Sequence, residues 1–450
     1  MKKAERREIV ADCNEFASWM KVSQHFFPSL PKWLNEMVDP RNQSYITYSA
    51  AVLVLMCVMK CVSGVVTMRS MNENFARNEA LENLTLLTGE EPKEMPDWQT
   101  ANNYLKRLQP EELNKIRFHM IDTLIRSKLF YPYRLLGCWR LILDGTGYAF
   151  FKERHCEHDL VIKIKNPTTG EEMTLYYHKV LEAKIVLSDN LVLSIGTEFI
   201  ENESADVSKQ DCEINAAKRL MPRIKKLFPR LPIVVQGDSL YATMPMMQLC
   251  AELKWHYLFT MKEGSQATLT RDFRDMIDME DFKDDYEVKY RNETGRACFV
   301  NNVEQFNDKS QTCNIFQYTY KDEEDKEVRF TWVTDLPITK GNLKELVAAG
   351  RGRWAIENLG FNNQKTGIYK IEHLCSKDPN AMKNHYLITQ IADILMQLYL
   401  AFDKTIYKLQ SSIKNVAVRI LSKFTEKRIS GEEYANLCKR TTMRLNEINT

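Results

Sequence analysis

The chain has 450 residues and a formal net charge of +2, with 44% hydrophobic and 27% charged residues. This length allows two or three domains with a large core, and the near-neutral charge means that any nucleic-acid binding must come from local clusters. Eleven cysteines without a C-x-x-C pair predict reduced thiols in a cytoplasmic protein rather than a disulfide framework.

Residues 1–135 are predicted to form an all-helical region for DNA-end binding, dimerisation or both. The apolar run Ala50–Met59 stops at Lys60 and is shorter than the ~20 residues of a membrane span, so it predicts a buried helix. Pro96 and Pro110 each stand at the start of a further helical pattern.

A mixed region follows at 136–261. Short apolar runs predict strands from 138 to an Asp-Gly end at 144–145, at 173–200 as two strands, at 231–238 and at 255–261, and helical patterns separate the later ones. The order β-β-β-α-β-α-β predicts an α/β fold, a ribonuclease H-like mixed sheet flanked by helices. Acids, Asp144 and Asp238, are expected at the ends of the first and fourth strands.

The pattern of apolar and polar residues changes twice in the remaining sequence. Residues 262–335 alternate apolar with polar side chains and predict a β-rich insertion. Helical patterns then return, which predicts a second part of the core at 336–400 and a helical C-terminal tail at 401–450.

The stretch Gly350–Lys365 predicts one continuous helix with a polar stripe. At about 100° per residue, Arg353, Glu357 and Gln364 fall within a stripe about 40° wide, whereas Lys365 lies about 80° from Glu357. A carboxylate beside a guanidinium stays ionised, as a metal ligand must. A surface ion pair on an ordinary helix is the alternative.

Three acids could form a metal site. The first and fourth strands are adjacent in a sheet of this type, so Asp144 and Asp238 would lie side by side, and a covering helix could add Glu357. Oxygen ligands suit Mg²⁺ or Mn²⁺, and two such ions promote in-line displacement at phosphorus. Asp-Gly and Gly-Asp are also common turn signals, so both aspartates could instead be loop residues.

Four blocks carry a family resemblance. DGTGY at Asp144, GDSLYAT around Asp238, and TWVTDLP followed by GRGRWAIENLGFNNQK resemble the DDE transposases of bacterial insertion sequences, in the group with a β-strand insertion before the glutamate. The resemblance covers roughly residues 95 to 400. It implies cleavage at the ends of a transposable element and strand transfer into target DNA.

The resemblance also implies cofactors and partners. Asp144, Asp238 and Glu357 would be the catalytic residues and would bind two Mg²⁺ (or Mn²⁺) ions. The partners would be double-stranded DNA, as terminal inverted repeats and target, and a second copy of the chain in a homodimer on DNA. We expect no membrane association, and no nucleotide cofactor because no phosphate-binding glycine motif occurs. Action in the bacterial cytoplasm, at the nucleoid, would follow.

The family motif Y-x2-R-x3-E-x6-K is matched in part. Arg353 and Glu357 match it, but Gly350 stands in place of the tyrosine and Gln364 in place of the lysine, with Lys365 as a shifted substitute. DNA contacts are therefore expected from Arg353, Lys365, Tyr241, Arg351 and Trp332. Trp332 would stack on a flipped base, or it could be a core residue.

Several alternatives stay open. The protein could be a metal-dependent nuclease on the same fold, or a catalytically silent transposase-derived DNA-binding protein, which the departures at Gly350 and Gln364 would allow. The basic segment Lys218–Arg230 could line a DNA path or form a solvated helix face. Residues 155–159 suggest zinc, with His178 or Cys212, but only half of a ligand set is visible, so a polar loop is preferred.

Overall fold

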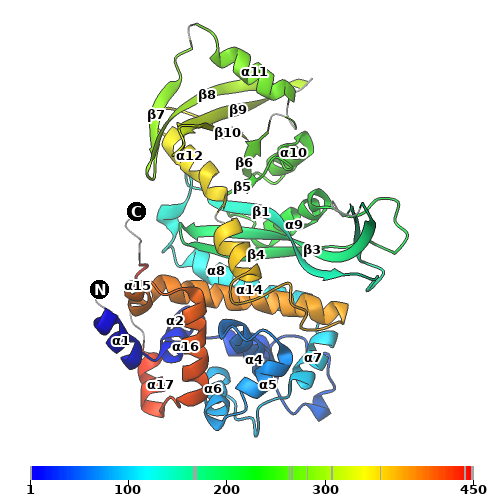
Figure 1. Ribbon diagram of the computed structural model, residues 1–450, viewed down its shortest axis with the longest axis vertical. Coiled ribbons are helices and arrows are strands. Elements are labelled where there is room, and N and C mark those ends of the chain that lie inside the picture. The colour runs from blue at the N-terminus through cyan, green and yellow to red at the C-terminus, as the bar shows by residue number, and fades with distance from the viewer. Residues whose placement is uncertain are drawn as a thin grey trace.

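The computed structural model describes residues 3–165, 170–262, 264, 267–280, 282–305, 308–354, 356–439 and 442–446. Side chains are not described at residues 3, 4, 6, 7, 305, 308–311 and 356–358. Two layers dominate the molecule, a helical layer and a long sheet beside it (Figure 1).

The helical layer combines both ends of the chain. Its helices are α1 (Lys3–Asp12), α2 (Glu15–Phe26), α3 (Leu30–Asn35), α4 (Ala50–Val62), α5 (Met68–Asn74), α6 (Asn78–Thr88), α7 (Trp98–Arg107), α8 (Pro110–Arg126), α14 (Pro379–Phe402), α15 (Lys404–Leu409), α16 (Ile413–Glu426) and α17 (Gly431–Leu437), with short 3₁₀ turns at Gln43–Tyr45 and Tyr131–Tyr133. Helix α14 contacts α2, α4, α7 and α8, and α16 contacts α2 and α6. The C-terminal helices therefore complete the N-terminal layer (Figure 1).

Helix α4 is the helix expected from the most apolar run of the sequence. Every one of its side chains is buried, including Lys60. Ser49 caps its N-terminus by accepting a hydrogen bond from the Val52 N–H. None of the helices in the described part of the chain has the length and apolarity that a bilayer span requires.

The sheet contains β1 (Trp139–Phe151), β2 (Leu160–Lys165), β3 (Glu172–Ser188), β4 (Leu191–Ile200), β5 (Ile233–Gly237), β6 (His256–Met261), β7 (Asp285–Tyr290), β8 (Glu293–Gln305), β9 (Asp308–Lys321) and β10 (Glu327–Thr334). Five of these strands lie in the order β4-β3-β1-β5-β6. Strand β1 is antiparallel to β3 and parallel to β5, which is parallel to β6. This is the ribonuclease H-like arrangement that the element order predicts.

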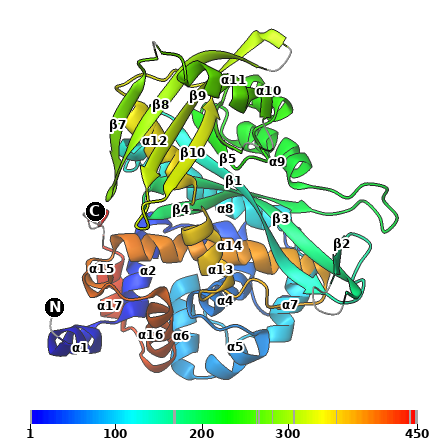
Figure 2. The ribbon, with the colours of Figure 1, turned by 45° about the horizontal axis from the view of Figure 1, so that its top comes forward.

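The inserted strands extend the same sheet. Strand β10 pairs with β6, and β9, β8 and β7 follow outward from it. Helix α11 (Ala267–Ile277) packs on β8, while α9 (Glu213–Leu227) and α10 (Met244–Glu252) connect the core strands. Figure 2 shows this continuous surface curving away from the helical layer.

Strand β2 and helix α11 were not predicted, and the end of the first strand also differs from the prediction. Strand β1 does not end at Asp144-Gly145 but continues to Phe151, because Gly145 to Phe151 stay paired with β3. Pairing with β5 stops at Ile142 and Gln236. Asp144 therefore lies in the middle of β1, at the point where the strand loses its β5 neighbour.

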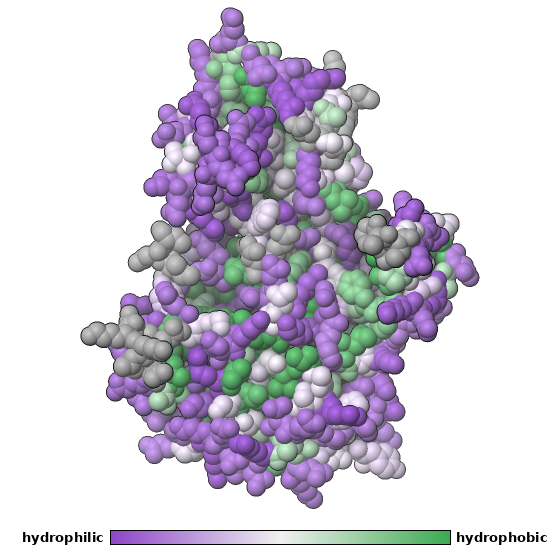
Figure 3. Space-filling view, in the orientation of Figure 1, coloured by the Kyte–Doolittle hydropathy of each residue, from purple (hydrophilic) through white to green (hydrophobic). Residues whose placement is uncertain are grey.

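Polar residues cover most of the face seen in Figure 3, above all the inserted strands at its top. Apolar residues gather in a band across its lower half, near the junction of the sheet with the helical layer. The sheet and the helical layer also share one hydrophobic core, to which β1, β3, β4, α4 and α14 all contribute.

Candidate active site

Asp144 and Asp238 are brought together by parallel pairing of β1 with β5. Trp139 pairs with Ile233 and Ile142 with Gln236, so the same register continued by two residues sets Asp144 level with Asp238. Asp238 follows directly after β5, where its carboxylate accepts a hydrogen bond from the Leu240 N–H at 2.9 Å. Two acids distant in sequence thus meet at one place in the sheet.

The surroundings of Asp144 disfavour its negative charge. Burial, together with the charges of Glu213 and Asp238, raises the pKa of this carboxyl to about 6 against the opposing effects of Arg353 and of the hydrogen bond from the Gly145 N–H. The Asp144 side chain keeps 24% of its surface exposed, and its Oδ2 lies 4.0 Å from Nη1 of Arg353. The acids Asp144, Asp238 and Glu213 outnumber the nearby cations, Arg353 and Lys179, and a divalent ion would relieve this excess of negative charge.

Glu213 is an acid of this site that no sequence motif indicates. It begins α9, and its carboxylate fills the space that a Cβ on Gly145 would need. Lys179 of β3 pairs with it. A single glutamate at a helix start has no distinctive spacing, so only the folded structure reveals its position beside Asp144.

Tyr241 does not have the position expected of a DNA contact. The residue is 1% exposed, and its hydroxyl donates a hydrogen bond to Oε2 of Glu213 at 3.2 Å. A hydroxyl that is already bonded inside the protein is poorly placed for a backbone phosphate. We therefore correct its expected role, because its contacts are those of a residue that positions Glu213.

Arg353 lies near Asp144 because the expected continuous helix is broken. Helix α12 (Leu343–Arg351) ends in a 3₁₀ turn, η3 (Gly352–Trp354), and a π-helix, η4 (Ile356–Asn362), leads to α13 (Asn363–Lys365). The Ala349 carbonyl accepts hydrogen bonds from Arg140 of β1 at 3.1 Å and from Gln236 of β5 at 2.8 Å. The two strands that carry the aspartates therefore also hold the point where the helix changes, and the stripe calculated for a regular helix does not apply.

Glu357 lies on η4, whose backbone is described, but its side chain lies outside the described residues. The π-helix contacts β1 and β4, and Phe361 packs with Ile142, two residues before Asp144. Its helix is thus held over the strand that carries the first aspartate. Single-turn π-helices often occur at functional sites.

Gln364 occupies an interior position rather than a DNA-facing one. Its side chain is 0% exposed, and its amide donates to Oε1 of Gln390 at 2.9 Å and to Oδ2 of Asp393 at 3.1 Å. Lys184, also buried, lies 3.8 Å from the same Asp393 oxygen. A lysine at 364 would place a second cation beside Lys184, which explains the departure from the family motif.

We expect the substitution Gln364→Lys to lower the free energy of unfolding by about 1–3 kcal/mol, because a buried ammonium would replace an amide that makes three hydrogen bonds with Gln390 and Asp393. Urea denaturation followed by circular dichroism measures this change. The neighbouring Lys365→Ala is the matched control and should stay within about 0.5 kcal/mol of wild type, since Lys365 is partly exposed and pairs with Glu372 at 3.5 Å. Unchanged stability of Gln364→Lys would contradict the buried assignment.

Trp332 is buried and Arg351 is partly buried against its neighbours, positions that argue against the expected DNA contacts. Trp332 is 2% exposed and stacks between Phe316 and Phe330, with ring centroids 5.0 and 5.9 Å away. The Arg351 guanidinium lies 4.2 Å from the Phe330 ring centroid and pairs with Glu293 at 3.2 Å. Both side chains stabilise the packing of α12 on the inserted strands.

Gly350 departs from the family motif for a steric reason. A Cβ at this position would lie 2.5 Å from the Trp332 ring, closer than atoms can approach. The buried indole therefore occupies the space beside the backbone at the position where the resembling family has a tyrosine.

The basic segment Lys218–Arg230 lies on α9 and the turn that follows it. Two of its arginines are neutralised, because Arg219 pairs with Glu198 at 2.6 Å and with Asp211 at 2.7 Å, and Arg223 pairs with Glu198 at 2.9 Å. Lys218, Lys226 and Arg230 are exposed. The face is thus less positive than its sequence indicates.

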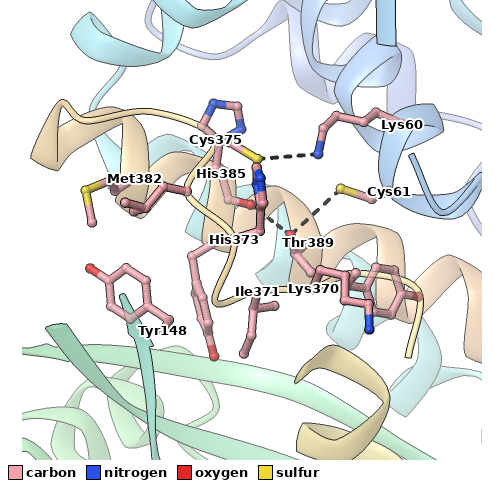
Figure 4. Close-up of a pocket in the computed structure, with 13 residues that line it drawn as sticks. Lys60, Cys61, Tyr148, Lys370, Ile371, His373, Cys375, Met382, His385 and Thr389 are labelled. Carbon is pink, nitrogen blue, oxygen red and sulfur yellow. Dashed lines mark hydrogen bonds between the residues drawn. The ribbon is translucent and has the colours of Figure 1, made fainter. Parts of the chain in front are cut away.

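A small cavity between α4 and the start of α14 lies apart from these acids (Figure 4). Lys60 donates a hydrogen bond to Sγ of Cys375 at 3.4 Å there. Burial by itself raises the pKa of the Cys375 thiol, but Lys60 and His373 outweigh it and lower that pKa. The cavity measures about 40 Å³, room for a water molecule or two, so it is no site for a nucleotide.

Comparisons with known proteins are consistent with the expected family. Residues 196–393 match the family model described as the transposase DDE domain, a segment that includes Asp238 and Glu357 but begins after Asp144. No curated protein matches the sequence. Among solved structures, the piggyBac transposase synaptic complex with hairpin DNA matches with a TM-score of 0.42 and 10% identity, covering 94% of this chain and 82% of that one.

Proposed function

Residues 196–393 match the transposase DDE domain, and from this match we propose that the protein is a DDE transposase in which Asp144, Asp238 and Glu357 form the catalytic metal site. The observation that carries the proposal is the alignment of Asp144 with Asp238 across β1 and β5. Glu357 would join them from η4, which packs on β1.

The residues present fit divalent metal ions. Asp144 and Asp238 offer carboxylate oxygens, the ligand type that Mg²⁺ and Mn²⁺ prefer. Burial and neighbouring acids disfavour the negative charge of Asp144, and a bound cation would compensate for that charge. With Glu357 they would hold two such ions. When bound, the ions would activate a water or a 3′-hydroxyl for attack at phosphorus and stabilise the leaving oxygen.

The protein's own groups would orient the site and grip DNA. Arg353, 4.0 Å from Asp144, is placed to contact a phosphate next to the scissile bond, and a guanidinium suits forked contacts of this kind. Lys365 is partly exposed and would add a point charge further along. Tyr241 and Lys179 would hold Glu213, and thereby the local charge, in place.

Two element ends must be brought together before strand transfer, so we also propose that the protein acts as a homodimer on double-stranded DNA. Its substrates would be the terminal inverted repeats of an element and a target duplex. Exposed basic residues of α9 would add affinity that depends on salt but not on sequence.

A strand-transfer assay tests the proposal. Purified protein with Mg²⁺ and a precut end carrying a free 3′-hydroxyl should join that end to a target plasmid, and omitting the metal should abolish joining. Cleavage without joining would favour the nuclease alternative. DNA binding without either reaction would favour the catalytically silent alternative.

A further inference from the structure

Four potential metal ligands converge at one end of the sheet, away from the acids of the active site. His155, Cys156 and Asp159 come from the loop between β1 and β2, and His178 comes from β3. One ligand atom from each lies within 4.8 Å of every other. The folded chain thus supplies the second half of a ligand set that the sequence shows only in part, and it does so through His178 rather than Cys212.

His155 is oriented as a metal-binding histidine would be. Its Nε2 lies 2.6 Å from the Lys377 carbonyl oxygen, to which an N–H at this atom donates. That contact leaves the lone pair on Nδ1, a buried atom without a hydrogen-bond partner among the described residues. A ring fixed through one nitrogen by a carbonyl, with the other nitrogen free, is the usual arrangement of a metal-ligating histidine.

Asp159 and His178 point inward from fully enclosed positions. Asp159 is 0% exposed, and its Oδ2 accepts hydrogen bonds from the backbone N–H groups of His155 and Cys156 at 2.5 and 3.1 Å. Its Oδ1 faces Sγ of Cys156 at 3.2 Å and Nε2 of His178 at 3.0 Å. Despite this short distance, neither ring nitrogen of the buried His178 has a partner with hydrogen-bond geometry within the described part of the chain.

We propose that His155, Cys156, Asp159 and His178 bind a structural Zn²⁺ ion. One thiolate, two imidazoles and one carboxylate form a tetrahedral set that suits zinc and disfavours Mg²⁺. Metal bonds of about 2.0–2.3 Å require ligand atoms about 3.3–3.8 Å apart, so only a small contraction of the cluster is needed. The protein fills all four positions, so the ion has no open site for a substrate.

The surroundings indicate what this ion would do. Phe151 stacks on His155 with ring centroids 4.3 Å apart, and Tyr148 lies 5.8 Å from the His178 ring, which gives the cluster an aromatic surround. The carbonyl that holds His155 belongs to Lys377, the residue directly before the N-cap of α14. The ion would therefore tie the loop after β1, the middle of β3 and the start of α14 together.

Metal analysis of the full-length protein tests the proposal. Protein expressed with zinc and dialysed should retain about one Zn²⁺ per chain, and Co²⁺ substitution should give the visible spectrum of a tetrahedral thiolate site. Cys156→Ser and His178→Gln should each lose most of the bound metal and the cobalt spectrum. A chelator should lower the melting temperature of the wild-type protein, and added Zn²⁺ should restore it.

Two matched controls separate this site from general thiol or imidazole binding. His158 lies in the same loop but outside the cluster, with Nδ1 2.9 Å from the Asn202 carbonyl oxygen, and Cys212 is exposed and outside it too. His158→Gln and Cys212→Ser should keep the metal. Wild-type protein without zinc and without the cobalt spectrum would overturn the proposal, as would equal metal loss in the control variants.

Discussion

Protein carrying Asp144→Asn is expected to lose DNA cleavage by about 10³-fold or more while it still binds DNA. Asparagine keeps the shape of the side chain but removes a charged metal ligand, and such ligands support several kcal/mol of transition-state stabilisation. Asp238→Asn should have the same effect, because the two aspartates are level across β1 and β5. A cleavage assay on DNA with element ends, paired with a gel-shift assay, measures both properties.

The same substitution should stabilise the metal-free protein above pH 6. Burial and neighbouring acids raise the folded-state pKa of Asp144 from 3.8 to about 6, so the folded state binds the proton more tightly than the unfolded state. The resulting stability is complete below pH 4 and is lost as the pH rises to 6. Ionised Asp144 then costs about 1–3 kcal/mol at pH 8, a cost that asparagine avoids and that thermal melts in a chelator would reveal.

A surface acid provides the control for this pair of measurements. Asp189 is exposed in the turn between β3 and β4, so Asp189→Asn should cleave DNA at nearly the wild-type rate. Cleavage by Asp144→Asn at the wild-type rate would remove that residue from the proposed site. Loss of cleavage together with loss of DNA binding would instead indicate a folding defect.

The core of the fold could be predicted because its strands are continuous apolar runs separated by clear helical patterns. The order of these runs along the chain predicts a ribonuclease H-like sheet. In such a sheet the first and fourth strands are adjacent, so Asp144 and Asp238 are predicted to be neighbours. The strand boundary at Asp144 was wrong because Asp-Gly indicates a turn locally, whereas pairing of the following residues with β3 keeps the strand extended. Tertiary pairing therefore overrode the local signal.

Other features depend on contacts between residues that are far apart in sequence. The break after α12 follows from two strand side chains, Arg140 and Gln236, that bind the Ala349 carbonyl. Nothing within Gly350–Lys365 except its glycines indicates that break. Tyr241 and Trp332 match family positions by type, but their burial is decided by Glu213 and by the inserted strands. Motif matching could not distinguish a core aromatic from a DNA contact.

Removal of one partner from the buried Lys184–Asp393 pair should have the largest effect on stability. The two side chains are 0% and 2% exposed, and Asp393 Oδ2 also accepts hydrogen bonds from Gln364 and Gln397. Lys184→Met would leave a buried carboxylate with amide donors but no cation. We expect the free energy of unfolding to fall by about 3–5 kcal/mol, measured by urea denaturation.

The stability loss in Lys184→Met has two possible sources, the lost attraction of the ion pair and the cost of a buried carboxylate without its cation. The double variant Lys184→Met/Asp393→Leu separates them. Replacing both partners removes the uncompensated carboxylate, so the double variant should be clearly more stable than Lys184→Met alone. Equal or greater loss in the double variant would show that the pair itself stabilises the fold.

The loss in Lys184→Met should also depend on pH. Burial raises the pKa of Asp393 even with Lys184 present, and without that cation the pKa should rise further. A raised folded-state pKa stabilises the protein while the carboxyl is protonated, and that stability is lost as the pH rises through the pKa. The difference in the free energy of unfolding between Lys184→Met and wild type should therefore be smaller at pH 5 than at pH 8.

Lys184 also lies 5.7 Å from the Phe361 ring centroid on η4. The Lys184→Met variant should therefore lose cleavage activity as well, because the helix that carries Glu357 loses this support.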